Sequence, residues 1–474
     1  MSNDNLAEHQ GRAPAQHADL TQGPILRTLL TFSIPTLFSN VLQTLGGTIN
    51  TIWVGQLLGD KALAATANAN IVMFLVFSFV FGFGMAATVK VGQYFGARDY
   101  DAARRVFGAG TGFCIFIAVA GGVAGYLLSD PLLRLLSTPA AIHEPAREYL
   151  DIVFLTMPFG TVSMMVSMSL RGAGDARTPL YAMILVTLLG TVLNPVLILG
   201  LGPAPRLGIA GSALANAIAM LAGAAAMIGW LYWRDIPIRL KGAELAYLFP
   251  RRKELSYVVA KGVPMGGQMA ITSAAGVIMV GLVNREGLMA TAAYGALMQI
   301  WSYIQMPAFA ISTAVSAMVA QNVGAGRHDR VNPVTMAGVY ANILMTGVLT
   351  CLLLLFDGPL LTLFLGTGSA AIPIAEHVQI ICTWSYVLVG VTMVLTGTMR
   401  SYGAVMLPLI VMVIAMYPAR LGFYWLAYPH IGGEAVWWAF PVGSVVSVAL
   451  IWLAYKRGAW RGQPQRVPAM AVAE

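Results

Sequence analysis

Charged residues are scarce in this sequence. Lysine, arginine, aspartate and glutamate make up only 10% of its 474 residues, whereas hydrophobic residues make up 58%. A soluble globular protein carries roughly a quarter charged residues. A soluble chain of this length would therefore have almost no solvated surface. The scarcity of charge excludes a soluble fold and indicates a chain built for a lipid bilayer.

The residue types that hold metals or perform catalysis are also few. There are three cysteines and six histidines. Cys114, Cys351 and Cys382 lie within or beside apolar segments, without the spacing of metal ligands or of a disulfide framework, and are predicted to be packing residues. No Walker-type phosphate loop is present, so ATP is not the direct energy source. We therefore expect no enzyme, no cofactor and no metal site, which leaves secondary transport.

Long uncharged segments are abundant. Each lacks Asp, Glu, Lys and Arg over 19 or more residues, and about 20 residues are needed to cross the hydrocarbon core. Lipid offers the backbone no hydrogen-bond partner, so each segment should be a helix. We expect an all-α integral membrane protein with about twelve transmembrane helices, and an interfacial stretch at 358–375, which glycines and prolines interrupt. The segments are 28–59, 62–89, 106–129, 152–170, 178–205, 207–233, 262–284, 287–326, 331–356, 378–399, 401–419 and 435–455.

The distribution of basic residues predicts the orientation. If both termini are cytoplasmic, most lysines and arginines fall in the inner segments, as the positive-inside rule requires. The net charge of +8 then reflects orientation rather than a nucleic-acid partner, and no nucleic acid is expected. The first 24 residues lack the apolar core of a signal peptide, so the first apolar run should remain as a span. We expect a multi-pass protein of the cytoplasmic (inner) membrane.

The sequence resembles itself at an offset of about 229 residues. Two halves of six spans each would have the same orientation, related by a pseudo-twofold axis along the membrane normal. The predicted parts are an N-terminal tail 1–24, an N-lobe 25–233, a basic cytoplasmic connector 234–254, a C-lobe 255–456 and a C-terminal tail 457–474. The paired stretches are 33–35 with 262–264, 93–97 with 321–325, 131–133 with 359–361, 170–171 with 399–400, and Pro179 with Pro408.

Several motifs in a specific order resemble the multidrug and toxic compound extrusion (MATE) family. The resemblance covers roughly residues 25 to 455. It implies a two-lobed antiporter that exports amphipathic, often cationic, compounds in exchange for protons or sodium ions. The motifs are Ile34-Pro35, Thr51-Ile52-Trp53-Val54-Gly55, Ala62-Leu63-Ala64-Ala65, Gly92-Gln93-Tyr94-Phe95-Gly96-Ala97, Leu170-Arg171-Gly172-Ala173-Gly174-Asp175 with Thr178-Pro179, Leu193-Asn194 and Gly208-Ile209-Ala210-Gly211.

The sequence departs from this family at its embedded carboxylates. Asn50 stands where many members have Asp, Thr272 where many sodium-type members have Glu, and Val389 where some members have Asp. Either H⁺ or Na⁺ could be the coupling ion, and no residue is assigned to it by motif. Asp151, an acid near the end of a span, is the candidate for coupling; the alternative is a solvated residue at a helix end.

In the N-lobe, polar residues at helical spacing predict a pocket. Asn40, Gln43, Gly47 and Asn50 share one face of the first span. Their amides either hydrogen-bond neighbouring helices or line a cavity. Family position favours the cavity for Asn50. We predict that Asn50 lines a polar pocket with the residues Gln43, Asn194 and Asn216.

In the C-lobe, Gln268 and Thr272 are four residues apart and should face the same way. Gln299 lies near Trp301 and Tyr303, an arrangement that suits an amphipathic guest, although an interfacial aromatic belt is an equal alternative for Trp301. Arg420 is a charge within the predicted bilayer and so a functional candidate; the alternative is that its side chain reaches the outer surface.

These observations favour an exporter of amphipathic small molecules or xenobiotics. The alternatives are a flippase for a lipid-linked saccharide, and a receptor or scaffold without transport. The expected partners are a small-molecule substrate and the lipid bilayer, and we expect a monomer. The substrate cannot be identified from the sequence.

Overall fold

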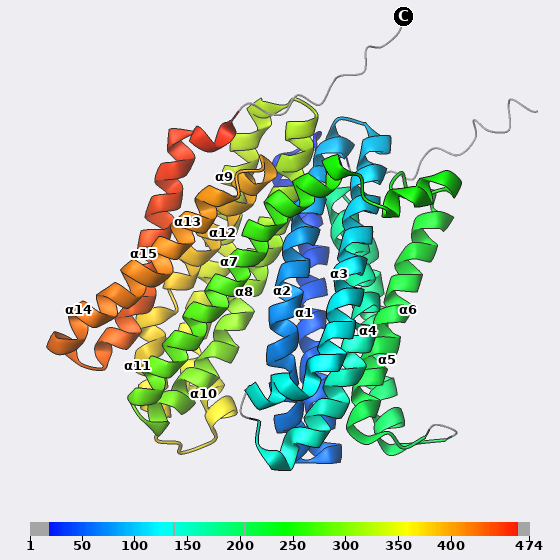
Figure 1. Cartoon of the computed structure of the whole chain (residues 1–474). Coiled ribbons are helices and arrows are strands. Elements are labelled where there is room, and N and C mark those ends of the chain that lie inside the picture. The colour runs from blue at the N-terminus through cyan, green and yellow to red at the C-terminus, as the bar shows by residue number, and fades with distance from the viewer. Residues whose placement is uncertain (1–18, 136–137, 203–204, 463–474) are drawn as a thin grey trace, which may run out of the picture. The chain divides into compact units, whose positions relative to one another are not determined.

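The computed structural model describes residues 19–135, 138–202 and 205–462, and every regular element in these ranges is a helix (Figure 1). The predicted tail 1–24 lies outside the described residues as far as residue 18, and the predicted tail 457–474 does so from residue 463. The all-α class is confirmed.

The chain forms two compact units. Unit 1 comprises Met1–Gln22 and Val41–Val259, and unit 2 comprises Gly23–Asn40 and Ala260–Glu474. The divisions fall inside the first and seventh long helices, whereas the predicted lobes 25–233 and 255–456 each began near the start of such a helix. The pseudo-twofold relation of the lobes stays a prediction.

Unit 1 is a bundle of long helices in which α4 packs against α2, α3, α5 and α6. Buried aliphatic and aromatic side chains fill the spaces between these helices. The elements are α1 (Ile25–Leu58, shared with unit 2), α2 (Asp60–Gly96), α3 (Tyr100–Leu135), α4 (Ala140–Gly172), α5 (Arg177–Leu199), α6 (Gly208–Trp233) and the 3₁₀ helix η2 (Gly242–Leu248).

Unit 2 is built around α8 and α12, which pack against each other and against α9. Helix α15 covers α12, α11 and the π-helical turn η4. The elements are α7 (Arg252–Arg285, shared with unit 1), α8 (Leu288–Gly324), η3 (His328–Arg330), α9 (Val331–Leu355), α10 (Asp357–Leu365), α11 (Ile372–Cys382), α12 (Ser385–Ser401), α13 (Met406–Ile414), η4 (Ala415–Leu421), α14 (Gly422–Ile431), α15 (Glu434–Arg457) and η5 (Ala459–Arg461).

The helices occupy the twelve predicted segments. Among the described residues, ten helices are long and apolar enough to cross a membrane, and eleven if the bent pair α11 and α12 is one span. Helix α2, with 37 residues, contains the uncharged segment 62–89. The prediction for 401–419 was wrong at both ends: that span begins at Met406 and continues through η4 and α14 to Ile431.

The two halves differ where a long helix of the first is interrupted in the second. Helix α4 has 33 residues in one piece. Its counterpart consists of α11 and α12, which meet at a bend of 44°. Helix α3 continues through Pro131, whereas α9 ends at Leu355 and the nine-residue α10 follows. Nine residues are too few to span the hydrocarbon core.

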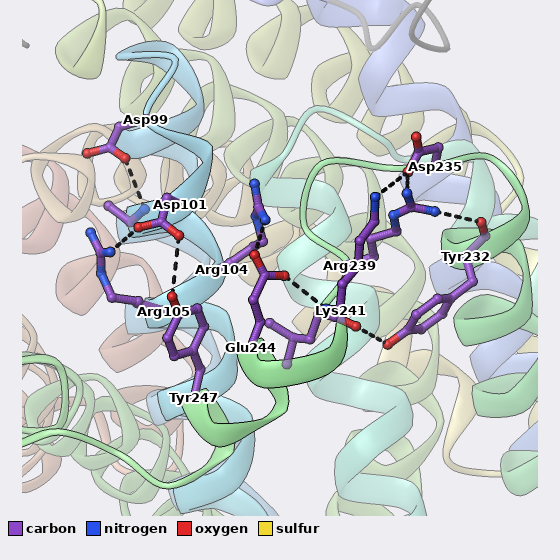
Figure 2. A network of polar contacts seen from close by, with 12 residues as sticks. Asp99, Asp101, Arg104, Arg105, Tyr232, Asp235, Arg239, Lys241, Glu244 and Tyr247 are labelled. Atoms are coloured by element: carbon purple, nitrogen blue, oxygen red, sulfur yellow. Dashed lines mark hydrogen bonds and ion pairs between the residues drawn. The ribbon is translucent and has the colours of Figure 1, made fainter. Parts of the chain in front are cut away.

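The connector between the halves is docked on α3. Its helix η2 packs against that helix, where a Cβ atom added at Gly108 or Gly112 would overlap the backbone of Tyr247 or Leu248. Figure 2 shows the polar contacts that hold it: Arg104 forms an ion pair with Glu244, and the Tyr247 hydroxyl donates to Asp101 Oδ1 over 3.4 Å. Glycine on α3 thus permits a backbone approach that these contacts then secure.

The rest of the connector is tied to the end of α6. Asp235 forms ion pairs with Arg239 and Lys241, and the Tyr232 hydroxyl donates to the Leu240 carbonyl over 2.5 Å (Figure 2). The basic residues that the sequence assigns to a cytoplasmic segment are therefore partly used in local structure.

Candidate functional site

A hydrogen-bonded cluster of amides and a hydroxyl lies inside unit 1. The Asn50 Oδ1 atom on α1 accepts a bond of 2.8 Å from the Ser212 hydroxyl and one of 3.1 Å from Asn216 Nδ2, both on α6. Ser212 is fully buried, while Asn50 and Asn216 keep partial exposure. One carbonyl oxygen thus joins two helices, and the predicted association of Asn50 with Asn216 is present.

Asn194 lies on α5, beside this cluster. Its Nδ2 atom donates to the Gly190 carbonyl over 2.8 Å, and a Cβ atom at Gly190 would lie 3.8 Å from Asn216 Oδ1. The side chain is 1% exposed, and its Oδ1 atom is buried without a hydrogen-bond partner. A buried acceptor left unpaired costs about 1–3 kcal/mol. Asn194 therefore offers an oxygen that a bound cation or donor could use.

Two outcomes differ from the predicted pocket. Gln43 is exposed and makes no side-chain hydrogen bond among the described residues, so no contact joins it to the cluster. Ser212 was not predicted as a member. It precedes Asn216 by four residues, one helical turn, and that spacing is the signal that could have identified it.

The predicted face of α7 contacts α13 in unit 2. Gln268 Nε2 donates to the Val405 carbonyl over 3.3 Å, and the Thr272 hydroxyl lies 3.1 Å from Met412 Sδ. Thr272 also donates to the Gln268 carbonyl over 2.8 Å. The two residues share a face, as their spacing predicts. Gln299 on α8 is exposed, and its side chain makes no hydrogen bond with a described residue.

Trp301 is fully buried in unit 2, so its assignment to an interfacial belt is wrong. Its Nε1 atom donates to the Thr383 hydroxyl over 3.0 Å. Its ring lies 5.2 Å from Tyr386, 6.0 Å from Phe440 and 6.1 Å from Tyr294, between ring centroids. Trp301 lies on the face of α8 that packs against α12 and α15, so its indole does not contact lipid.

Arg420 lies in the interior of a span rather than at its end. It belongs to the π-helical turn η4, and the span extends eleven residues further, to Ile431. At 1.5 Å per residue this is about 16 Å, more than an arginine side chain can cover. This distance argues against the alternative in which the Arg420 side chain reaches the outer end of the helix. A charge at the bilayer centre costs about 2.5–3.5 kcal/mol on insertion scales.

Asp151 lies eleven residues after the start of α4, and its carboxylate is 3.7 Å from Arg147 Nε, one turn earlier. One of its oxygens, Oδ1, is buried without a hydrogen-bond partner. No described contact joins Asp151 to the Asn50 cluster. The Asp151 side chain is 21% exposed, and its role in coupling stays a prediction.

The chemistry of the unit 1 cluster is that of neutral oxygens and amide donors. Asn50, Asn194, Ser212 and Asn216 include no group that titrates near neutral pH. Within the described part of the chain, no group of three or more His, Cys, Asp or Glu side chains is placed to hold a metal ion. The cluster can bind or orient a polar ligand, but it cannot exchange a proton through its own side chains.

Comparison with known proteins identifies the family. The MatE family model matches residues 35–196 and again residues 264–426, which confirms the internal repeat. The chain is 33% identical to the probable multidrug resistance protein YoeA of Bacillus subtilis (strain 168), over 92% of this chain and 94% of that one. It is 30% identical to the probable multidrug resistance protein YpnP of the same strain, over 94% and 97%.

A solved structure has the same fold. An outward-facing multidrug resistance MATE family transporter of the MOP superfamily superposes with a TM-score of 0.86 at 21% identity, covering 95% of this chain and 100% of that one. Together with the two family-model matches, the long apolar helices and the duplicated halves lead to one conclusion. The chain is a multi-pass membrane protein that belongs to the MatE family, the multidrug and toxic compound extrusion transporters.

Proposed function

We propose that this protein is a secondary active exporter of amphipathic small molecules in the cytoplasmic membrane, with both termini and the connector in the cytoplasm. The observation that carries the proposal is the cluster of Asn50, Ser212 and Asn216 inside one unit of a MATE-family chain. The names of its relatives YoeA and YpnP, both probable multidrug resistance proteins, support the direction of transport. The excess of basic residues in the inner segments supports the orientation.

The coupling chemistry follows from the neutral cluster. A buried carboxylate can couple transport to protons because its protonation changes along the cycle. A sodium site needs oxygen ligands, commonly with a carboxylate among them. Asn50, Thr272 and Val389 supply at most neutral oxygens. Coupling therefore runs through an acid near the end of a span, such as Asp151, or through the charge of the substrate itself.

The alternative of a flippase for lipid-linked saccharides gains no support from any contact among the described residues. A monomer is the functional form that we expect.

Flux in proteoliposomes tests the proposal. A panel of fluorescent amphiphiles of either charge is loaded, and an imposed gradient of pH, sodium or electrical potential should drive the transport of at least one of them. Asn50→Leu removes the shared acceptor and should reduce that flux tenfold or more. Thr51→Val is the matched control, because Thr51 is exposed on the same helix and donates only to the Gly47 carbonyl.

Absence of gradient-driven flux across the whole panel would contradict the exporter. Equal flux in Asn50→Leu and the parent, at equal thermal stability, would be compatible with an exporter but would show that the cluster does not line its transport pathway. Asp151→Asn tests the coupling separately: unchanged gradient-driven flux would exclude Asp151.

A further inference from the structure

The unit 2 guanidinium of Arg420 has no counter-charge. Among the described residues it forms no ion pair, and its Nε atom is buried without a hydrogen-bond partner. The one polar contact is from Nη1 to Met416 Sδ, at 3.6 Å, and a thioether is a weak acceptor. A guanidinium stays charged in proteins. The protein thus holds a full positive charge inside a span with most of its donors unused.

Aromatic rings hold this guanidinium in place. Its central carbon lies 3.9 Å from the centroid of the Phe440 ring on α15, a cation–π contact that offsets part of the cost of burial. The Phe440 ring lies 5.8 Å from Tyr294 and 6.0 Å from Trp301. The guanidinium is therefore stacked on the edge of the aromatic cluster, with one face against Phe440.

The backbone around Arg420 is shaped for this placement. Residues Ala415–Leu421 form a π-helical turn that contains Pro418, and such turns occur frequently at functional sites. On α15, a Cβ atom added at Gly443 would lie 3.2 Å from both the Arg420 Cβ atom and the Ala415 carbonyl oxygen. Gly443 thus gives the stem of Arg420 room between η4 and α15.

Two tyrosines complete a set of donors. The Tyr294 ring on α8 lies 5.8 Å from the Phe440 ring that stacks on the guanidinium, and the Tyr386 ring on α12 lies 5.2 Å from Trp301, between ring centroids. Neither hydroxyl makes a hydrogen bond with another side chain or carbonyl of the described residues, so both are available as donors. The arginine fork matches a carboxylate or a phosphate in geometry.

We propose that Arg420, with Tyr294 and Tyr386, is an anion-binding subsite that takes the carboxylate or phosphate group of an aromatic or amphipathic substrate. The inference rests on the proposed export of amphipathic molecules and assigns one class of them, the anionic one. The unused guanidinium donors bind the acidic group.

The test uses two probes with the same apolar body and different charge, 1-pyrenebutyrate and 1-pyrenebutanol. Their affinity for the purified full-length protein is measured by energy transfer from tryptophan to pyrene. A charge-assisted hydrogen bond should favour the anion by about tenfold to hundredfold. Arg420→Gln should abolish this preference and leave the affinity for pyrenebutanol unchanged. Arg457→Gln, at the exposed end of α15, should leave it intact.

The subsite is refuted if the parent protein does not prefer the anion, or if Arg420→Gln keeps the same preference. It is also refuted if Arg420→Gln loses affinity for both probes equally at an unchanged melting temperature. If Arg420→Gln fails to fold, Arg420→Lys decides, because it keeps the charge without the fork and should lower the preference at least threefold. Displacement of pyrenebutyrate by phosphatidylglycerol at equal concentration would assign the site to a bilayer lipid and overturn the substrate assignment. If the parent protein prefers the anion but shows no gradient-driven flux, the exporter is refuted and the anion-binding subsite is still supported.

Discussion

The docked connector gives a prediction whose size follows from the structure. Gly112→Ala places a methyl group where the Leu248 backbone lies, so η2 must move away from α3. Overpacking of this kind costs about 1–3 kcal/mol. The substitution also gains about 1 kcal/mol of helix propensity, but that gain stabilises α3 whether or not the connector is docked. The free energy that holds η2 in place should therefore fall by about 1–3 kcal/mol.

Limited trypsin digestion measures this docking. Cleavage of a transiently opened segment follows the population of the open form when reclosing is fast. A loss of about 1–3 kcal/mol therefore predicts cleavage after Lys241 that is about 5- to 150-fold faster. Gly121→Ala is the matched control, because Gly121 lies on the same helix and its Cβ atom would have no neighbour within 4 Å. The control gains the same propensity without the overlap.

Equal cleavage rates in the two variants would refute the reasoning, since they would show that the connector is not held by its close approach to α3. The Arg104–Glu244 ion pair alone is too weak to hold the connector on α3. Its side chains are 25% and 21% exposed, and surface pairs contribute only about 0–1 kcal/mol.

Three further predictions address topology, coupling and stability. A cysteine placed at Lys241 should resist an impermeant thiol reagent in intact cells, whereas one at Arg285 should be labelled; labelling at Lys241 would reverse the orientation. Asn50→Asp should make gradient-driven flux depend on pH, because a carboxylate titrates and an amide does not; a flat pH profile would contradict a neutralised site. Thr383→Val leaves Trp301 Nε1 without its acceptor and should lower the free energy of unfolding by about 1–3 kcal/mol, which thermal denaturation measures.

The membrane helices could be predicted because lipid imposes a simple rule on the sequence. A span needs length and the absence of charge, and both are visible in the segments themselves. The Asn50–Asn216 contact was predictable for another reason: family position pointed to Asn50, and both residues are amides in otherwise apolar helices. Ser212 escaped because a serine among alanines and glycines on α6 differs little from its small neighbours.

The same rule explains the main error. A segmentation based on charge must stop at Arg420, so it ended the span at residue 419. The structure continues the helix past this charge, which is accommodated by Phe440 from another helix and by the space at Gly443. Those partners are more than 15 residues away in sequence. Tertiary contacts of this kind leave no mark on local composition, and the same holds for the burial of Trp301 against Thr383.

The interruption between α11 and α12 affects where each of the duplicated halves can bend. A continuous helix resists bending because each turn is tied to the next by hydrogen bonds, but in α4 this continuity is interrupted at Pro145 and Pro158, which have no N–H to donate. The 44° bend of its counterpart and the π-helical turn η4 are two places where that continuity is already lost. The backbone of α4 stays a single helix through Pro158, whereas its counterpart ends at Cys382 and begins again at Ser385. We therefore expect unit 2 to bend first at the break between α11 and α12 and at η4, and unit 1 to bend first at Pro158 of α4.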